Sequence, residues 1–161
     1  MSDPLVQRVD CIHVEVPDLE SGLAFYRDRL GHELLWPAET SAGLKMADGG
    51  SELVLNAEPW KWKTDLLVES SESASKRFEE AGGSVISGPF DIEIGKAVVV
   101  RDPWGNEFVL LDASKGQLAT DADKNVVGVE NYSGITLKGT RYAIDDVVRA
   151  RSAVLDRFSD Q

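Results

Sequence analysis

Few side chains in this sequence have a type and spacing suited to chemistry by themselves. It has one cysteine, Cys11, and two histidines, His13 and His32. Cys11 has no acid–base partner nearby in the sequence, so we expect a small buried side chain rather than a nucleophile. His32 follows a helix-like run and is expected at the surface. No serine triad, phosphate-binding loop or CxxC pattern is present, so hydrolase, nucleotide-binding and thiol-redox functions have no support.

Aromatic rings and a run of acidic residues offer two other modes of binding. Trp36, Trp60 and Trp104 belong to a set of four tryptophans, more than usual for 161 residues, and aromatic faces suit planar or cationic ligands. Packing and dimer contacts are the alternative roles for these rings. Residues 121–125 begin like a calcium loop, but Val126 replaces the required glycine and excludes that motif.

The chain that must position these residues contains one unit twice. Val16 and Gly31 match Val68 and Gly83, 52 residues later in both cases. Residues 50–55 match residues 105–110 at a spacing of 55. The repeat predicts two βαβββ modules, at about residues 8–56 and 63–112.

Apolar patterns and turn residues predict the elements of each module. A helix is expected at 19–30, after Asp18 and before Gly31, and a second helix ends at Gly82 and Gly83. Strands are expected at 10–16, 33–38, 42–47, 51–56, 64–68, 84–87, 94–101 and 106–112. The prediction is one domain over 1–112 and an extension over 113–161, with an amphipathic helix at about 142–158.

Composition restricts the partners. Seventeen basic and 28 acidic residues give a net charge of −11 and a pI of about 4.6, so nucleic acid and anionic membrane surfaces are poor partners. A single cysteine suits a reducing compartment. The first residues lack a signal-peptide pattern, and no apolar run approaches about 20 residues. A cytoplasmic location is therefore predicted.

Four stretches of the sequence, in order, resemble the glyoxalase, bleomycin resistance protein and extradiol dioxygenase group, also called the vicinal oxygen chelate superfamily. They lie at residues 13–19, 24–31, 80–83 and 102–108, and the resemblance covers about residues 8–112. It implies an α+β fold in which two βαβββ modules form a cupped mixed sheet with a cavity, completed in a homodimer. The group includes metal-dependent isomerases, epimerases and dioxygenases as well as metal-free drug binders.

The resemblance also places four standard metal positions, one near the start of each module's first strand and one on each last strand. In this sequence they are Cys11, Val54, Lys63 and Val109. These side chains do not assemble an ordinary hard-metal site. No metal is therefore expected at the standard positions.

Side chains two residues away from the standard positions, on the same strands, face the same side of the sheet as the standard positions do. Here they are His13, Glu52, Asp65 and Glu107, and such a displaced row would suit a divalent metal: Zn, Mn, Fe or Ni. Two alternatives stay open. The row binds cationic or hydroxyl groups of a ligand without metal, or His13 is a polar cavity residue and the glutamates lie in water at the strand ends.

The leading hypothesis is a small-molecule-binding protein without the standard metal ligands, with no cofactor, in which these residues and the tryptophans bind an aromatic or cationic compound. Its acidity and tryptophan content resemble those of drug-sequestering resistance proteins. The alternative is a metal-dependent lyase, isomerase or dioxygenase that uses the displaced row. A third possibility is an interaction protein that binds partners through its dimer and its C-terminal helix.

Overall fold

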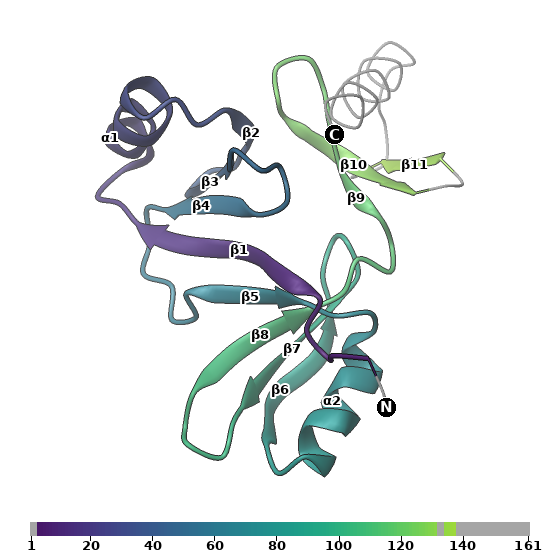
Figure 1. Cartoon of the computed structure of the whole chain (residues 1–161). Helices are drawn as coiled ribbons and strands as arrows, with labels where there is room; N and C mark the ends of the chain where they lie inside the picture. The colour runs from purple at the N-terminus through teal and green to yellow at the C-terminus, as the bar shows by residue number, and fades with distance from the viewer. Residues whose placement is uncertain (1–2, 132–133, 138–161) are drawn as a thin grey trace.

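Two consecutive βαβββ units form the larger part of the protein, as the internal repeat predicts. The computed structural model describes residues 3–131 and 134–137 (Figure 1). The first unit consists of β1 (Arg8–Glu15), α1 (Leu19–Leu23) with the π-helical turn η1 (Ala24–Arg29), β2 (Leu34–Pro37), β3 (Ser41–Lys45) and β4 (Glu52–Asn56). The second consists of β5 (Thr64–Leu67), α2 (Ser71–Glu80), β6 (Ser84–Asp91), β7 (Lys96–Arg101) and β8 (Glu107–Leu111). The predicted α+β fold is confirmed.

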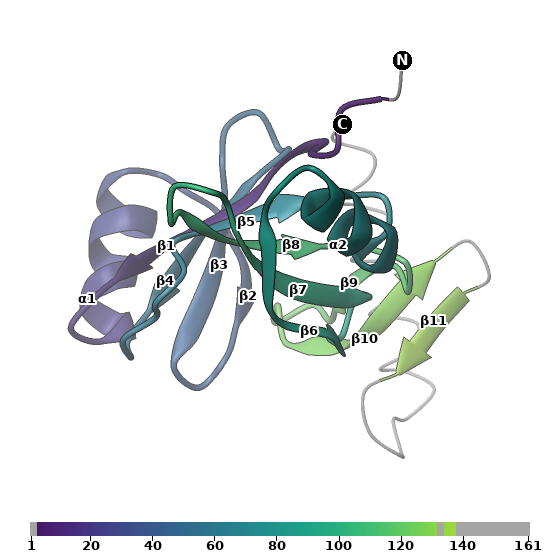
Figure 2. The same cartoon turned by 90° about the horizontal axis from the view of Figure 1, so that it is seen from below.

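An eight-stranded mixed sheet joins the two units. Its order is β2-β3-β4-β1-β5-β8-β7-β6, so the first strands of the two units lie side by side at its centre. They run antiparallel, with Cys11 opposite Asp65. The pairs β1 with β4 and β5 with β8 are parallel. Figures 1 and 2 show the sheet bending between its halves, each of which carries one helix.

Both helices begin and end at residues whose local chemistry explains the boundary. The Asp18 carboxylate accepts the Ser21 N–H at 2.7 Å and caps α1. The Ser70 hydroxyl caps α2 in the same way. Gly31 and Gly82 follow the helices with φ of +83° and +106°, which glycine adopts without a steric penalty. These caps fix where each helix returns the chain to the sheet.

Alternation along β7 and β8 produces an apolar layer on each face of the second half-sheet. The layer under α2 is built from Val68, Ala74, Val98, Val100 and Leu110. The layer on the opposite face is built from Ala97, Val99, Val109 and Leu111, with Trp62, Ile92 and Ile94 packed against it. Val109 lies opposite Asp65 in the paired strand, so this second layer borders the centre of the sheet.

The chain after Asp112 forms a second, three-stranded antiparallel sheet that the sequence analysis did not predict. Its strands are β9 (Gln117–Thr120), β10 (Val126–Asn131) and β11 (Gly134–Leu137), in the order β11-β10-β9. At the turn between β9 and β10, Lys124 Nζ lies 3.0 Å from Glu33 Oε1 of the first unit. The helix predicted at 142–158 lies outside the described residues.

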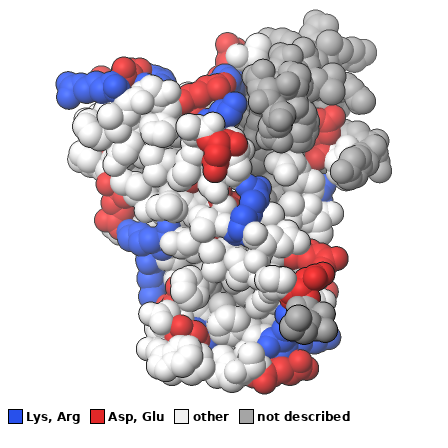
Figure 3. Space-filling view, viewed as in Figure 1, with Lys and Arg blue, Asp and Glu red and all other residues white. Residues whose placement is uncertain are grey.

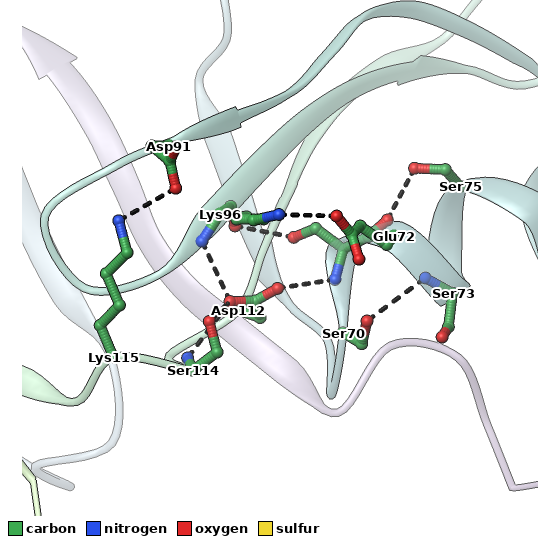
Figure 4. A network of polar contacts seen from close by, with 10 residues as sticks. Ser70, Glu72, Ser73, Ser75, Asp91, Lys96, Asp112, Ser114 and Lys115 are labelled. Carbon is green, nitrogen blue, oxygen red and sulfur yellow. Dashed lines mark hydrogen bonds and ion pairs between the residues drawn. The ribbon is translucent and has the colours of Figure 1, made fainter.

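Asp112 anchors the start of this extension to the second unit (Figure 4). Its carboxylate accepts backbone N–H groups of Ser71, Lys96 and Ser114 at 2.7, 3.0 and 3.2 Å, and the Ser114 hydroxyl at 2.6 Å. Burial acts to raise the pKa of Asp112, but the hydrogen bonds outweigh it and lower that pKa to about 2. One carboxylate thus holds together α2, β7 and the extension. Within the described residues, no helix combines the length and apolar character needed to cross a membrane.

Candidate functional site

A cavity of about 260 Å³ lies against the central strands of the large sheet. Its floor carries Asp10, Cys11 and His13 of β1, Glu52 of β4 and Asp65 of β5. The loop between β6 and β7 covers one side through Ile92, Glu93 and Ile94, and β9 contributes Gln117 and Leu118. We call this space the acidic cavity, because the charged side chains that line it within residues 3–131 are all carboxylates or His13. Residues of both units and of the extension therefore form one site.

A β-bulge in β1 turns an additional acidic side chain into the acidic cavity. Two residues of β1 span one residue of β5 between Val9 and Cys11, which leaves Asp10 as the extra residue. Burial, followed by the charge of Glu52, raises the pKa of Asp10 to about 6. Arg8 opposes the shift from 4.0 Å away. The bulge places a carboxyl with a perturbed pKa beside Cys11.

Three side chains of different chemistry converge on the floor of the acidic cavity. Asp65 Oδ2 lies 3.2 Å from Cys11 Sγ and 3.1 Å from His13 Nε2, and Sγ lies 3.4 Å from Nε2. Within residues 3–131, this is the one group of three such side chains whose donor atoms meet closely enough to share a metal ion. We call it the Cys11 cluster. Its members come from the two adjacent central strands.

The Cys11 cluster leaves one buried oxygen without a partner. Asp65 is 9% exposed, and its Oδ1 atom accepts no hydrogen bond. The far side of the imidazole is held: Asn56 Nδ2 lies 2.9 Å from His13 Nδ1. Burial, and next the charge of Asp65, raises the pKa of the Cys11 thiol far above its ordinary value. Free Cys11 is therefore a thiol and is not activated as a nucleophile.

Trp36 and Glu52 form the wall of the acidic cavity on the side of the first unit. The Trp36 indole N–H donates to Glu52 Oε2 at 2.9 Å. The indole lies across Gly43, where a Cβ atom would fall inside the ring. The absence of a side chain at Gly43 thus allows Trp36 to reach Glu52.

Trp60 lies at the edge of the cluster. Its ring centroid is 5.5 Å from that of His13, with an interplanar angle of 34°. The backbone N–H of Trp60 donates to the Glu15 carboxylate, which also forms an ion pair with Lys63. Trp60 is 41% exposed, so this neighbour of the imidazole also faces solvent.

Glu107 and Trp104 lie away from the acidic cavity. Glu107 accepts hydrogen bonds from Arg101 Nη2 at 2.6 Å and Trp62 Nε1 at 3.1 Å, and Lys61 Nζ lies 3.0 Å away. The bonds from Arg101, followed by those from Lys61 and Trp62, lower the pKa of Glu107 to about 2. Trp104 is 84% exposed in the turn between β7 and β8.

The structure thus brings together three residues of the displaced row, His13, Glu52 and Asp65, but does not bring Glu107 into that row. The reason is strand direction. Because β5 and β8 are parallel, two residues forward from Lys63 to Asp65 and two residues back from Val109 to Glu107 lead apart rather than together. The observed row across the sheet joins Glu52, Cys11, Asp65 and Val109.

Of the standard positions, only Cys11 belongs to a group of potential metal ligands within the described residues. Val54 lines the acidic cavity, Lys63 pairs with Glu15, and Val109 belongs to the apolar layer. Sequence reasoning missed the combination of Cys11 with His13 and Asp65. It also missed Asp10, because no local signal marks the bulge, and the covering residues of β9, because the extension was not assigned strands.

A larger hollow of about 590 Å³ lies between the N-terminal segment and α2. Its polar groups are the Ser70 cap and surface side chains such as Asp3 and Arg77, and it contains no convergent group of metal ligands. The face of the molecule in Figure 3 carries small groups of both charges. The acidic cavity is therefore a local feature and remains the candidate site.

A family model described as a glyoxalase-like domain matches residues 11–111. The chain belongs to the glyoxalase-like domain family. This confirms the resemblance identified in the sequence and places the acidic cavity within the matched region. Among curated proteins, none matches the sequence.

Solved structures share this glyoxalase-like fold at low sequence identity. Methylmalonyl-CoA epimerase from Mycobacterium tuberculosis is 15% identical, with a TM-score of 0.58 over 71% of this chain and 93% of the epimerase. An uncharacterized Methanosarcina mazei protein is 22% identical, with a TM-score of 0.52 over 70% of this chain and 97% of that one.

Homoprotocatechuate 2,3-dioxygenase from Brevibacterium fuscum is 24% identical, with a TM-score of 0.53. The match covers 68% of this chain and 37% of the dioxygenase, so this chain spans little more than a third of that protein. The glyoxalase-like fold therefore occurs in an epimerase and a dioxygenase, and the similarity shows a common fold.

Proposed function

We propose that this glyoxalase-like protein binds a small molecule that carries a positive charge beside a flat apolar group. The observation that carries the proposal is the lining of the acidic cavity. Its carboxyl side chains are Asp10, Glu52, Asp65 and Glu93, and none of the described residues that line it is a lysine or an arginine. A cation that enters this space gains attraction from several carboxylates at once.

Repulsion among these carboxylates supports the proposal. Burial raises the pKa of Asp10 most, and the negative charges of Glu52 and Asp65 raise it further. A bound ammonium group would replace part of this repulsion with attraction. Each hydrogen bond from an ammonium group to a carboxylate contributes about 1.5–3 kcal/mol.

The apolar part of the ligand has a matching surface. Ile92 and Ile94 pack on the apolar layer of the second unit and line the acidic cavity. Trp36, Val54 and Leu118 add to the apolar lining. Aromatic and aliphatic walls with a few placed polar groups are typical of small-molecule sites. The cavity is thus suited to an aromatic amine.

Titration of the chelator-treated protein with benzylamine, benzyltrimethylammonium and benzyl alcohol tests this function. We expect at least one cation to bind about tenfold or more tightly than the alcohol, measured by calorimetry. Glu52→Gln should weaken cation binding about tenfold. Glu107→Gln is the matched control from the other unit and should change binding less than about twofold.

The proposal is wrong if neither cation binds more tightly than benzyl alcohol. It is also wrong if Glu52→Gln and Glu107→Gln have equal effects, because the charge that matters would then lie outside the acidic cavity.

A metal-dependent lyase, isomerase or dioxygenase is the second candidate, and the Cys11 cluster is the observation that favours it. A divalent metal bound there would supply a Lewis acid for a substrate oxygen. Asn56 would hold the His13 ring, and Glu52, fixed by Trp36, would border the substrate. Elemental analysis of the native protein separates this candidate from the first. The homodimer and the cytoplasmic location stay predictions, the former testable by light scattering.

A further inference from the structure

We propose that Cys11, His13 and Asp65 form a binding site for a divalent transition metal ion. The ligand atoms would be the Cys11 thiolate sulfur, His13 Nε2 and a carboxylate oxygen of Asp65. This ligand set combines one standard position of the fold with two residues that are not standard, and it places all ligands on β1 and β5. It leaves Glu52 and Glu107 outside the coordination sphere.

The distances within the Cys11 cluster fit a common metal. Bond lengths of about 2.0–2.3 Å at tetrahedral angles separate neighbouring ligand atoms by about 3.3–3.6 Å. The three separations here are 3.1, 3.2 and 3.4 Å. Movements of a few tenths of an ångström would therefore convert the hydrogen-bonded cluster into a coordination site.

The second observation is the buried oxygen of Asp65. Both contacts from Cys11 and His13 go to Oδ2, while Oδ1 is buried and has no partner. A carboxylate oxygen without a partner in the protein interior costs free energy. The hydrogen bonds of the Cys11 cluster leave this oxygen without a partner. A metal ion beside the carboxylate would compensate its negative charge.

The surroundings of His13 are those of a metal ligand. Asn56 contacts Nδ1 and leaves Nε2 directed at Cys11 and Asp65. An amide group offers an oxygen as well as a nitrogen, so rotation of the Asn56 amide would let Oδ1 accept a hydrogen bond from His13 Nδ1–H when Nε2 binds a metal. The thiol proton of Cys11 would leave to solvent as the ion binds.

The donor set also defines the class of metal. One sulfur, one nitrogen and one oxygen suit Zn²⁺ and Co²⁺ and disfavour Mg²⁺ and Ca²⁺, which take oxygen ligands. Three protein ligands leave a fourth position open, and the cluster borders the acidic cavity. A ligand in the cavity could therefore reach the metal.

The metal site does not depend on the proposed binding of an organic cation. Two negative ligands neutralise a divalent ion, while Asp10, Glu52 and Glu93 still line the cavity. Selective binding of either cation without metal uptake would support the first proposal and overturn the second. Metal uptake by a protein that binds neither cation more tightly than benzyl alcohol would support the second proposal and overturn the first.

Cobalt titration of the reduced, chelator-treated protein tests the site. We expect one equivalent of Co²⁺ per chain, a thiolate-to-cobalt charge-transfer band in the near ultraviolet, and loss of the band when Zn²⁺ displaces cobalt. Cys11→Ser should abolish the band. His13→Gln and Asp65→Asn should each weaken cobalt binding more than about tenfold, and Glu107→Gln should leave uptake and spectrum unchanged.

Circular dichroism and a melting curve of each variant keep the test interpretable. If Asp65→Asn does not fold, Cys11→Ser and His13→Gln carry the comparison. The proposal is overturned by the absence of saturable cobalt uptake, by uptake without the charge-transfer band, or by a band that survives in Cys11→Ser.

Discussion

Glu52 and Glu107 occupy matching positions in the two units, and a tryptophan indole N–H donates to each. Their surroundings differ. Glu107 also binds Arg101 and Lys61, which lower its pKa to about 2. Glu52 lines a cavity to which the described part of the chain contributes three further carboxyl groups and no lysine or arginine. The repeated backbone therefore supplies two similar positions, and the neighbouring side chains make one a surface ion pair and the other part of a binding site.

The ends of the two units differ as well. Asp112 follows the last strand of the second unit and anchors the extension, whereas Ala57 holds the matching position, 55 residues earlier. The second unit is thereby joined to a segment that reaches back to the first unit through Lys124 and Glu33. Only the second unit is thus followed by a segment that covers the acidic cavity.

The largest expected effect is the loss of this anchor. Asp112→Ala removes four hydrogen bonds to a side chain that is 3% exposed, and leaves the N–H group of the buried Ser71 without this partner. We expect the free energy of unfolding, measured in urea, to fall by about 2–4 kcal/mol. Asp102→Ala is the control, because Asp102 accepts similar bonds in an exposed turn. Equal losses would show that burial of Asp112 is unimportant.

The next effect separates the two tryptophan–glutamate pairs. Gly43→Ala would push the Trp36 ring away from Glu52 and leave the Trp62–Glu107 pair intact. We expect a loss of about 1–3 kcal/mol in the free energy of unfolding and a changed Trp36 indole resonance in NMR spectra. Gly50→Ala, where a Cβ meets nothing closer than 3.6 Å, is the matched control. An unchanged Trp36 signal would contradict the role of Gly43.

The anchor also makes stability depend on pH. The pKa of Asp112 is lowered from 3.8 to about 2 in the folded protein, so its contribution is present above about pH 4 and is lost as pH falls towards 2. In Asp112→Asn, the change of the free energy of unfolding with pH should be smaller by about 1–2 kcal/mol. The measurement is the difference between wild-type and variant unfolding free energies at pH 2–5. A difference independent of pH would contradict the lowered pKa.

The smallest effect concerns Glu107. Arg101 makes the largest contribution to its lowered pKa, so Arg101→Gln should raise that pKa towards 4.5. The Trp62 indole N–H signal should then titrate between about pH 5 and 3 in the variant, and stay constant over that window in the wild-type protein. The Trp36 signal, which reports on Glu52, serves as the internal control because its pH profile should be the same in both proteins. If Trp62 titrates identically in both proteins, the ion pair with Arg101 does not set the pKa.

The fold could largely be predicted because its signals are local or repeated. Asp18, Gly31 and the matching pair Val16 and Val68 mark element ends and the repeat, and apolar alternation marks the strands. The candidate site was only partly predictable. His13, Glu52, Asp65 and Trp36 were identified as candidates and line the acidic cavity, whereas Glu107 and Trp104 lie elsewhere.

By itself, the sequence determined the two βαβββ units, the family and the residue types available for chemistry. Only the tertiary structure decided that Cys11 faces Asp65, that a bulge turns Asp10 inward, and that β9 covers the cavity. The physical reason is the separation along the sequence between the residues that interact. Caps and alternation depend on neighbours along the chain, but strand direction and register depend on contacts between residues as far apart as Cys11 and Asp65.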